Sequence, residues 1–395
     1  MGVLEDARTM AKGRSDHRRR GRQKTMGGTD ARPRERLLGP IDGLMLLLPL
    51  AIVAKVAHWD DTVVFALAAL AIVPVAKWMG RATEQLAIHS GPGIGGLLNA
   101  SFGNAAELII ALVALSRGPA LYPIVRASII GSILGNLLLV MGLAMLAGGL
   151  RYKHQTFSSK AASTSASMMT LAVIGLALPS LLASPIVVGQ ALPSSVVDAF
   201  SLEVAAVLLG IYVLSIIFAL VTHTHVYNPL AETEGEESEV AHWSRSKALG
   251  VLILATAVLA LLAEVMVGAV EGAAERVGMS DVFVGVIVVA IVGNAAEHST
   301  AVLMALRNRM DVAIAIASGS SAQIALFVAP AVVLASLAMG QGVLQLTFEP
   351  MALIAVALSV AIANIVTIDA ESNWLEGAML LGVYALMALF FFHHP

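Results

Sequence analysis

Two short stretches of this sequence place an amide and a carboxylate inside apolar runs. The first, 101–110, reads SFGNAAELII, and the second, 291–300, reads IVGNAAEHST, so the five letters GNAAE occur twice. Where such runs cross a membrane, an ionisable residue is costly and rare, and it usually faces a polar pathway. The repeated motif therefore predicts one polar site to which both copies contribute.

Each copy carries its polar residues at helical spacing, since residues three apart share one face of a helix. Gly103 and Gly293 precede the two asparagines, and a local helix break or a close helix contact costs least at glycine. The asparagines alone could serve only to form hydrogen bonds between helices. Two glutamates at matching positions favour a binding site. The predicted stripes are Ser101, Asn104 and Glu107 in the first copy, and Asn294, Glu297 and Thr300 or Ala301 in the second.

The composition of the chain is that of a membrane protein. Hydrophobic residues make up 58% of the 395 positions and charged residues 13%, whereas a soluble domain carries roughly 45–50% and about 25%. The net charge of −3 does not indicate a nucleic-acid partner, and the lack of cysteine excludes disulfides and thiolate metal sites.

Eleven apolar runs of about 17–28 residues are each long enough to cross a hydrocarbon core of roughly 30 Å as a helix. Because a bilayer offers no water to backbone groups, helices are the expected form of such runs. We therefore predict an all-α polytopic membrane protein. The runs are 40–58, 62–79, 93–116, 120–148, 160–182, 200–221, 246–270, 281–305, 311–336, 346–367 and 374–393.

The basic residues predict the orientation. The N-terminal tail, 1–36, carries eleven Lys and Arg; we expect it to be disordered and cytoplasmic, with binding to anionic lipid as the alternative. Under the positive-inside rule the N-terminus is then cytoplasmic and the C-terminus outside. The inside loops hold Lys77, Arg81, Arg151, Lys153, Lys160, Arg245, Lys247, Arg307 and Arg309, and the outside loops hold little beyond Arg117 and Arg276.

The position of the motif predicts an inverted repeat. With the run 40–58 set aside as an extra first helix, the remaining ten split into five-helix repeats, 62–221 and 246–394, and GNAAE falls in the second helix of each. Because five is odd, the second repeat enters the membrane from the opposite side. In that architecture the binding site lies near the bilayer midplane, between broken helices.

A cytoplasmic acidic linker, 222–245, joins the two repeats. Its central segment, AETEGEESE, is either a solvated linker or a segment that attracts cations or regulates transport. The acidic residues are Glu232, Glu234, Glu236, Glu237 and Glu239.

Two carboxylates and two amide oxygens suit a hard cation, and calcium accepts 6–8 oxygen ligands. The following helix of each repeat offers more donors: Ser128, Ser132 and Asn136 in RASIIGSILGN, and Ser318, Ser320, Ser321 and Gln323 in ASGSSAQIALF. Small residues in such runs also serve plain helix packing. The predicted cation-binding set is Glu107, Glu297, Asn104, Asn294, Ser318, Ser321, Gln323 and Ser128.

Three further residues suit gating or proton relay. Glu84 lies near the cytoplasmic end of its helix and Glu264 near the outer end of the equivalent helix, so each faces one mouth of a pathway; structural pairing at the interface is the alternative. His298 follows Glu297 and could relay protons or form a hydrogen bond between helices. A carboxylate can hold a proton or share a divalent ion, but not both at once, and this competition allows exchange.

The two motifs resemble the paired signature repeats of the calcium/proton antiporters, in the cation/calcium exchanger superfamily. GNAAELI and GNAAEHSTAV carry the likeness, together with SIIGSILGNLLLVMG, ASGSSAQIALF and LLAEVMVGAVE, and it covers about residues 40–394. The resemblance implies ten core helices and an extra first one, with calcium between Glu107 and Glu297. It also implies alternating access, in which the first two helices of each repeat slide against a rigid bundle.

One position departs from that family. Many members have a glutamine where this chain has Arg126. A cation there opposes a nearby calcium ion, unless its side chain points to the outer interface.

The sequence thus predicts a secondary transporter that exchanges Ca²⁺ for H⁺ in a bilayer, without enzymatic activity, cofactor or nucleic-acid partner. No Walker motif is present. The expected location is a bacterial inner membrane, and a homo-oligomer is compatible with the sequence. The alternatives are a sodium-coupled calcium exchanger of the same superfamily, a passive cation channel and an intramembrane hydrolase.

Overall fold

The computed structural model describes residues 40–223, 242–340 and 342–393. The chain divides into Met1–Pro40 and a compact unit, Ile41–Pro395, which holds the long apolar helices. The basic tail, 1–36, and the acidic segment, 231–239, lie outside the described residues, so the predictions made for them stay predictions.

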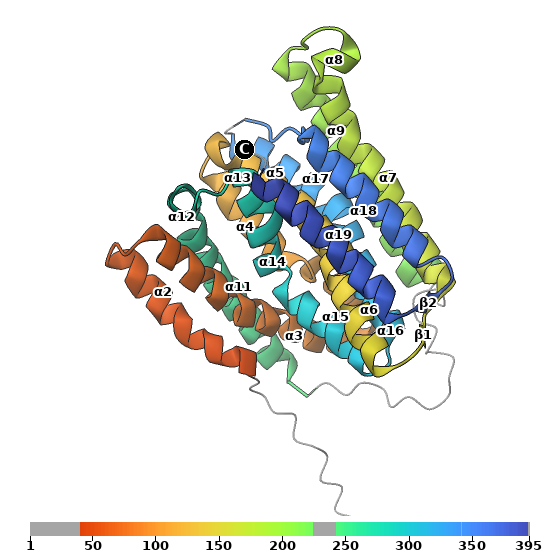
Figure 1. Ribbon diagram of the computed structural model, residues 1–395. Coiled ribbons are helices and arrows are strands. Elements are labelled where there is room, and N and C mark those ends of the chain that lie inside the picture. The colour runs from red at the N-terminus through yellow and green to blue at the C-terminus, as the bar shows by residue number, and fades with distance from the viewer. Residues whose placement is uncertain (1–39, 224–241, 341, 394–395) are drawn as a thin grey trace, which may run out of the picture. The chain divides into compact units, whose positions relative to one another are not determined.

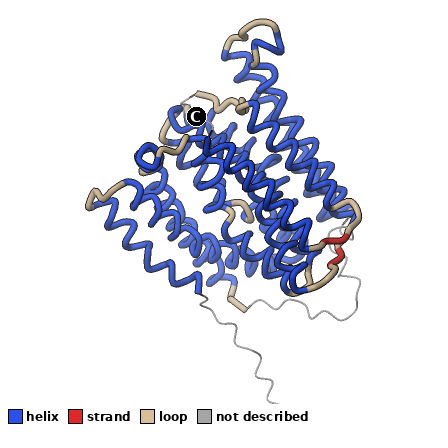
Figure 2. Tube along the Cα trace, in the orientation of Figure 1, coloured by secondary structure: helices blue, strands red, loops and turns tan. Residues whose placement is uncertain are grey.

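Helices account for nearly all of the described chain (Figure 2), as the lack of water in a bilayer requires. In the first half the elements are η1 (Pro40–Leu46), α2 (Leu47–Val56), α3 (Asp61–Phe102), α4 (Ala105–Ser116), η2 (Pro119–Leu121), α5 (Tyr122–Leu134), η3 (Gly135–Val140), α6 (Met141–Arg151), β1 (Gln155–Thr156), α7 (Ser159–Ala183), α8 (Pro185–Val188), α9 (Ser194–Ile217) and η4 (Phe218–Thr222).

The second half repeats this pattern of broken helices. Its elements are α11 (Arg245–Val267), α12 (Val270–Val277), α13 (Asp281–Phe283), η6 (Val284–Val289), α14 (Ala290–Gly293), α15 (Ala295–Leu306), α16 (Met310–Gln323), η7 (Ile324–Val328), α17 (Ala329–Met339), α18 (Pro350–Val366), β2 (Glu371–Ser372) and α19 (Trp374–His393). The strands β1 and β2 pair antiparallel.

The described chain has seven helices long and apolar enough to cross a membrane, or eight if the pair 270–277 and 281–293, bent by 118°, forms one span. A multi-spanning helical membrane protein is therefore confirmed. The count of eleven spans stays a prediction, because several segments are short or broken. The seven are Asp61–Ser90, Pro119–Arg151, Ser159–Ala183, Ser194–Thr222, Arg245–Val267, Met310–Met339 and Trp374–His393.

The helix α3 joins two runs that the sequence predicted as separate, 62–79 and the beginning of 93–116. It is bent, since a methyl group at Gly95 would overlap the backbone of Ala87. In a straight helix, residues eight apart are separated by about 12 Å. Between these two residues lies the sequence Gly91-Pro92-Gly93, where the proline removes a helical hydrogen bond.

The predicted run 346–367 is helical only from Pro350, and the boundary was wrong because 346–349 is not helical. Pro350 suits the first helical turn, where its missing N–H is not needed. Before it, alternate side chains of Leu344, Leu346 and Phe348 are buried. The serines Ser336, Ser201 and Ser180 accept hydrogen bonds from the N–H groups of Leu344, Leu346 and Phe348 respectively.

The extra first helix, α2, packs against α3 and α11, and the three lie side by side in Figure 1. At one end Asp42 accepts hydrogen bonds from Lys77 Nζ at 2.8 Å and Trp78 Nε1 at 2.9 Å. At the other end Lys55 Nζ donates to the Gly268 carbonyl at 3.1 Å, just after α11 ends. We define α2, α3 and α11 as the outer layer.

Glycines allow α19 to pack closely on α6, and this contact is testable. A Cβ atom at Gly377 would overlap the backbone of Leu146, whereas Gly382 on the same helix has nothing within 4 Å. We expect Gly377→Leu to lower the free energy of unfolding by about 1–3 kcal/mol through overpacking. Gly382→Leu is the matched control and should keep the parent's melting midpoint in detergent. Equal midpoints for the two variants would contradict the close packing.

Candidate cation-binding site

The motif asparagines stand where two helices are interrupted. Asn104 separates α3 from α4 with φ −100° and ψ 25°, and Asn294 separates α14 from α15 with φ −89° and ψ 5°. Gly103 lies in the first break and Gly293 directly precedes the second. Of the two features that the sequence left open at these glycines, a helix break and a close helix contact, the break is present at both. The backbone carbonyls of Asn104 and Asn294 accept hydrogen bonds from the N–H groups of Leu108 and His298, so each new helix begins at its asparagine and keeps the spacing to its glutamate. Only the step from Ser101 to Asn104 crosses a break, and the predicted stripes otherwise stay a prediction.

Each break places a carboxylate in the first turn of a new helix. Glu107 lies in the first turn of α4 and Glu297 in the first turn of α15. The amino-terminal end of a helix carries a partial positive charge, which favours a negative group there. Local backbone geometry thus eases the cost of placing two glutamates inside the protein.

Asn104 is bound by the second half of the chain. Its Nδ2 donates to Gln323 Oε1 at 2.6 Å, and its Oδ1 accepts from Ser320 Oγ at 2.6 Å. Asn104 is 1% exposed. Both its oxygen and its amide group therefore have partners on α16, 216 to 219 positions away in the chain.

Asn294 is bound by the first half in the same way. Its Nδ2 donates to Ser132 Oγ at 3.0 Å and to the Ala290 carbonyl at 2.8 Å. Its Oδ1 accepts from Asn136 Nδ2 at 2.9 Å. Each motif asparagine thus contacts one serine and one amide side chain of the opposite half, as two inverted repeats around a shared site require.

Irregular helix geometry adjoins both sets of partners. The π-helical segment η3 begins at Gly135, beside Asn136, and η7 begins at Ile324, directly after Gln323. Such segments are rare and often mark functional sites in helices. The matching positions of η3 and η7 extend the likeness of the two halves beyond the motif itself.

We call the hydrogen bonds of Asn104 and Asn294 with their serine and amide partners the network. The two carboxylates lie beside it. The side chain of Glu107 lies against the backbone of Gly293, with its Cγ 3.3 Å from where a Cβ would be. Asn136 Nδ2 lies 3.5 Å from Glu297 Oε2. Glu107 therefore reaches the backbone beside Asn294 of the second half, and Glu297 reaches Asn136 of the first half.

Two oxygen atoms in this region are buried and have no hydrogen-bond donor among the described residues: Glu107 Oε2 and Asn136 Oδ1. A buried oxygen of this kind is costly unless a proton or a cation binds it. Carboxylate, amide and hydroxyl oxygens are the ligands that calcium prefers. No group of three or more His, Cys, Asp or Glu that could hold a metal ion occurs among the described residues. The amide, hydroxyl and carboxylate oxygens of this region also differ from the His and Cys ligands that are usual at zinc sites.

The predicted serines are placed differently from the motif residues. Ser128, Ser318 and Ser321 donate to carbonyls of their own helices, at Val125, Ile314 and Ala317. The hydroxyls that contact the motif asparagines belong to Ser132 and Ser320, which the sequence offered as donors but which are missing from the predicted set. The available signal was the dipeptide Gly-Ser, which occurs at 131–132 and again at 319–320.

Two of the predicted gating residues, Glu84 and Glu264, lie on the outer-layer helices α3 and α11, whereas His298 directly follows Glu297. Glu264 pairs with Arg117, and Glu84 is exposed on α3 beside Gln85, whose side chain accepts hydrogen bonds from the N–H groups of His242 and Trp243. The Nε2 atom of His298 is buried and has no hydrogen-bond partner among the described residues.

Arg126, the position at which this chain departs from the family, does not donate to the asparagines or the carboxylates. Its Nη1 donates to Thr347 Oγ1 at 3.0 Å, near the end of α5 where Tyr122 donates to the Gly342 carbonyl at 3.1 Å. Ser132 is six residues further along this helix, or about 9 Å. The segment before α18 thus binds the guanidinium at the far end of α5.

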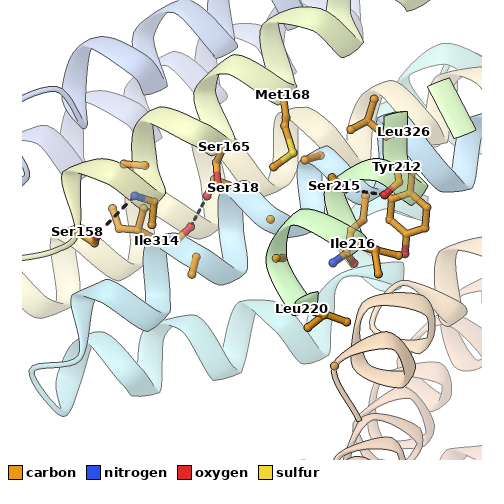
Figure 3. A pocket seen from close by; sticks show the side chains of 18 of the residues that line it. Ser158, Ser165, Met168, Tyr212, Ser215, Ile216, Leu220, Ile314, Ser318 and Leu326 are labelled. Atoms are coloured by element: carbon orange, nitrogen blue, oxygen red, sulfur yellow. Dashed lines mark hydrogen bonds between the residues drawn. The ribbon is translucent and has the colours of Figure 1, made fainter. Parts of the chain in front are cut away.

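A cavity of about 240 Å³ reaches the network from one side (Figure 3). Its wall is formed by α7, α9, η4 and α16, with Gly96 of α3, and it includes Ser318 and Gln323. Asp311 and Ser158 line it near the beginnings of α16 and α7. Gln323 therefore contacts Asn104 on one side and this cavity on the other.

The equivalent space on the opposite side is closed. Methyl groups at Gly131 on α5 and Gly285 on η6 would overlap Val286 and Ala127 respectively. Only about 10 Å³ is left between α4, α5 and the end of α11, beside Ser128. The counterpart of Gly131 is Gly319 on α16, which lines the large cavity and has nothing within 4 Å of the place that a Cβ atom would take.

A multi-spanning helical protein whose two broken helices share one polar site has the architecture of a secondary transporter. The chain matches the family model of the sodium/calcium exchanger proteins over residues 61–221 and 247–393. This chain belongs to that family.

Its relatives cover most of its length. The Ca(2+)/H(+) antiporter of Synechocystis sp. is 44% identical over 370 residues, which is 89% of this chain and 96% of that protein. The Ca(2+)/H(+) antiporter ChaA of Bacillus subtilis is 43% identical over 346 residues, or 87% and 96%. The solved structure of native YfkE is 37% identical with a TM-score of 0.75, covering 88% of this chain and 99% of that one.

The hydrogen bonds separate two adjacent serines, which gives a test of the site. Ser320 donates to a motif asparagine, whereas Ser321 donates to its own helix. We expect Ser320→Ala to weaken Ca²⁺ binding by roughly 10- to 100-fold, the usual cost of losing a group that orients a ligand. Ser321→Ala is the control and should bind Ca²⁺ like the parent in isothermal titration. A larger loss in Ser321→Ala would mean that the donors are assigned wrongly.

Proposed function

We propose that this protein exchanges Ca²⁺ for H⁺ across a membrane by alternating access. Its relatives at 43–44% identity carry the name Ca(2+)/H(+) antiporter, and YfkE, whose fold it shares, is also named a Ca²⁺/H⁺ antiporter. The observation that carries the proposal is the pair of buried oxygens, Glu107 Oε2 and Asn136 Oδ1, beside a second carboxylate, Glu297.

The chemistry of exchange follows from the two carboxylates. With both ionised, Glu107 and Glu297 repel each other in a medium of low dielectric constant, and a divalent cation between them removes that repulsion. Protons on the same oxygens also remove it, and they expel the cation. The asparagines add neutral oxygens, and their bonds to Ser132, Asn136, Ser320 and Gln323 hold the two halves in register.

The unequal packing of the two sides supports an alternating-access state. The cavity is lined at the beginnings of α7 and α16, which we expect on the cytoplasmic side from the positive-inside rule. The closed contact between α5 and η6 lies on the opposite side. In this conformation the site is accessible from the cytoplasm, with the N-terminus cytoplasmic, the C-terminus outside, and a bacterial inner membrane as the location.

The rival functions are less well supported. A sodium-coupled exchanger shares the family and the fold, but relatives at 43–44% identity are named for protons. A passive channel does not need a site closed on one side. An enzymatic role has no support from the named activities of the relatives.

The first test of exchange uses everted vesicles with an imposed pH gradient. We expect the parent to accumulate ⁴⁵Ca²⁺, and Glu107→Gln and Glu297→Gln each to abolish uptake, because a neutral amide cannot alternate between cation and proton. Glu275→Gln, an exposed glutamate on α12, is the control and should transport normally. Uptake that persists in either site variant would reject the assignment of that carboxylate.

A second test identifies the coupling ion. Proteoliposomes that contain a pH-sensitive dye should show proton movement opposite to Ca²⁺ movement, whether or not sodium is present. Uptake that requires a sodium gradient would establish the sodium-coupled alternative. Ca²⁺ entry without any proton movement would establish a channel.

A further inference from the structure

An ion pair joins the end of α4 to the end of α11. Arg117 directly follows α4, and its guanidinium contacts the carboxylate of Glu264. Both side chains are partly exposed, at 42% and 48%. The helix α4 carries Glu107, and α11 belongs to the outer layer, so this pair connects a site helix to that layer.

The repeat contains a second arginine at the equivalent place. Asn104 and Asn294 are 190 positions apart, and so are Arg117 and Arg307. Each arginine directly follows the motif helix of its own half, α4 or α15. Arg307 is exposed, and its guanidinium has no hydrogen bond or ion pair with another described residue.

The outer layer also contains an equivalent glutamate. Glu84 on α3 corresponds to Glu264 on α11, and the two residues before each of them are buried: Ala82 and Thr83 in one case, Leu262 and Ala263 in the other. The helix α3 packs against α15, as α11 packs against α4. Arg307 and Glu84 thus occupy the same places in the repeat as Arg117 and Glu264.

The Arg117–Glu264 ion pair lies on the side of the protein where the cavity is closed. Arg117 and Glu264 lie on the side where α5 and η6 are in contact, and Arg307 lies near the start of α16, on the side of the open cavity. The arginine on the closed side is therefore in an ion pair, and the arginine on the open side forms none with a described residue.

On the basis of the proposed exchange by alternating access, we propose that Arg117–Glu264 and Arg307–Glu84 are two latches that form in turn. The first holds the outer mouth closed in the conformation seen here. The second forms when the outer layer moves, and it holds the cytoplasmic mouth closed. An exposed ion pair is weak, so neither latch traps the transporter in one state.

The test exploits the absence of cysteine from the chain. Ala315→Cys places one thiol on the cavity wall, at an exposed position. Its counterpart, Ala127, is covered by Gly285 on the closed side. The rate at which a membrane-impermeant maleimide labels this thiol from the cytoplasmic side therefore measures how much of the protein is open to the cytoplasm.

Charge reversals should shift that rate in opposite directions. Arg117→Glu breaks the outer latch, so labelling should slow by roughly two- to fivefold, the range set by one exposed ion pair. Adding Glu264→Arg to it should restore the parent rate. Arg307→Glu should speed labelling, and adding Glu84→Arg should reverse that effect.

The control is a second outer ion pair, away from the end of α4. Arg276 on α12 pairs with Asp60, just before α3, and a hydrogen bond from Thr62 together with Arg276 holds the pKa of Asp60 below its ordinary value. Arg276→Glu should leave the labelling rate unchanged. Size-exclusion profiles establish that each variant is folded.

An unchanged rate in folded Arg117→Glu, or failure of either charge swap to restore the rate, would overturn the latches. Labelling needs no ion gradient. Normal labelling shifts in a protein that fails to exchange Ca²⁺ for H⁺ would therefore reject the proposed function and leave the latches standing.

Discussion

The structure depends on keeping two carboxylates, Glu107 and Glu297, inside an apolar protein, where no described arginine or lysine forms an ion pair with either of them. A permanent arginine or lysine beside Glu107 and Glu297 would neutralise them, but it would also exclude any other cation. The site instead surrounds them with neutral amides and hydroxyls and with the amino-terminal turns of α4 and α15. Removing a charged group from water costs several kcal/mol per ion, so in the proposed exchange a proton or a cation on these carboxylates offsets that cost.

The network around the asparagines also explains why the halves must meet. Asn104 depends on Ser320 and Gln323 of the second half, and Asn294 depends on Ser132 and Asn136 of the first. These amides are buried where the halves meet, and without their partners across that interface they would be incompletely bonded, which is costly. The site thus joins the two repeats as well as offering a place for a cation.

Glycine contacts give the two sides their different states. At Gly131 and Gly285 the helices α5 and η6 meet at the backbone, whereas the equivalent Gly319 faces a cavity. A symmetrical sequence therefore has an asymmetrical structure, in which one mouth is packed and the other is open. Moving between such states needs surfaces that pack equally well on either side, and small residues provide them.

Composition and the repeated motif were enough to predict the membrane class and to single out the two glutamates as a proposed site, and they offered a helix break as one of two possibilities beside each glycine. Composition indicates the membrane class, and an ionisable residue inside an apolar helix usually faces a polar pathway. The sequence by itself did not determine which serines contact the asparagines, because Ser318, Ser320 and Ser321 differ only in the face of α16 on which they lie. It also missed that α3 is one bent helix, that 346–349 is not helical, and that Arg126 bonds to Thr347. Those features depend on contacts between segments far apart in the chain, and only the tertiary structure sets them.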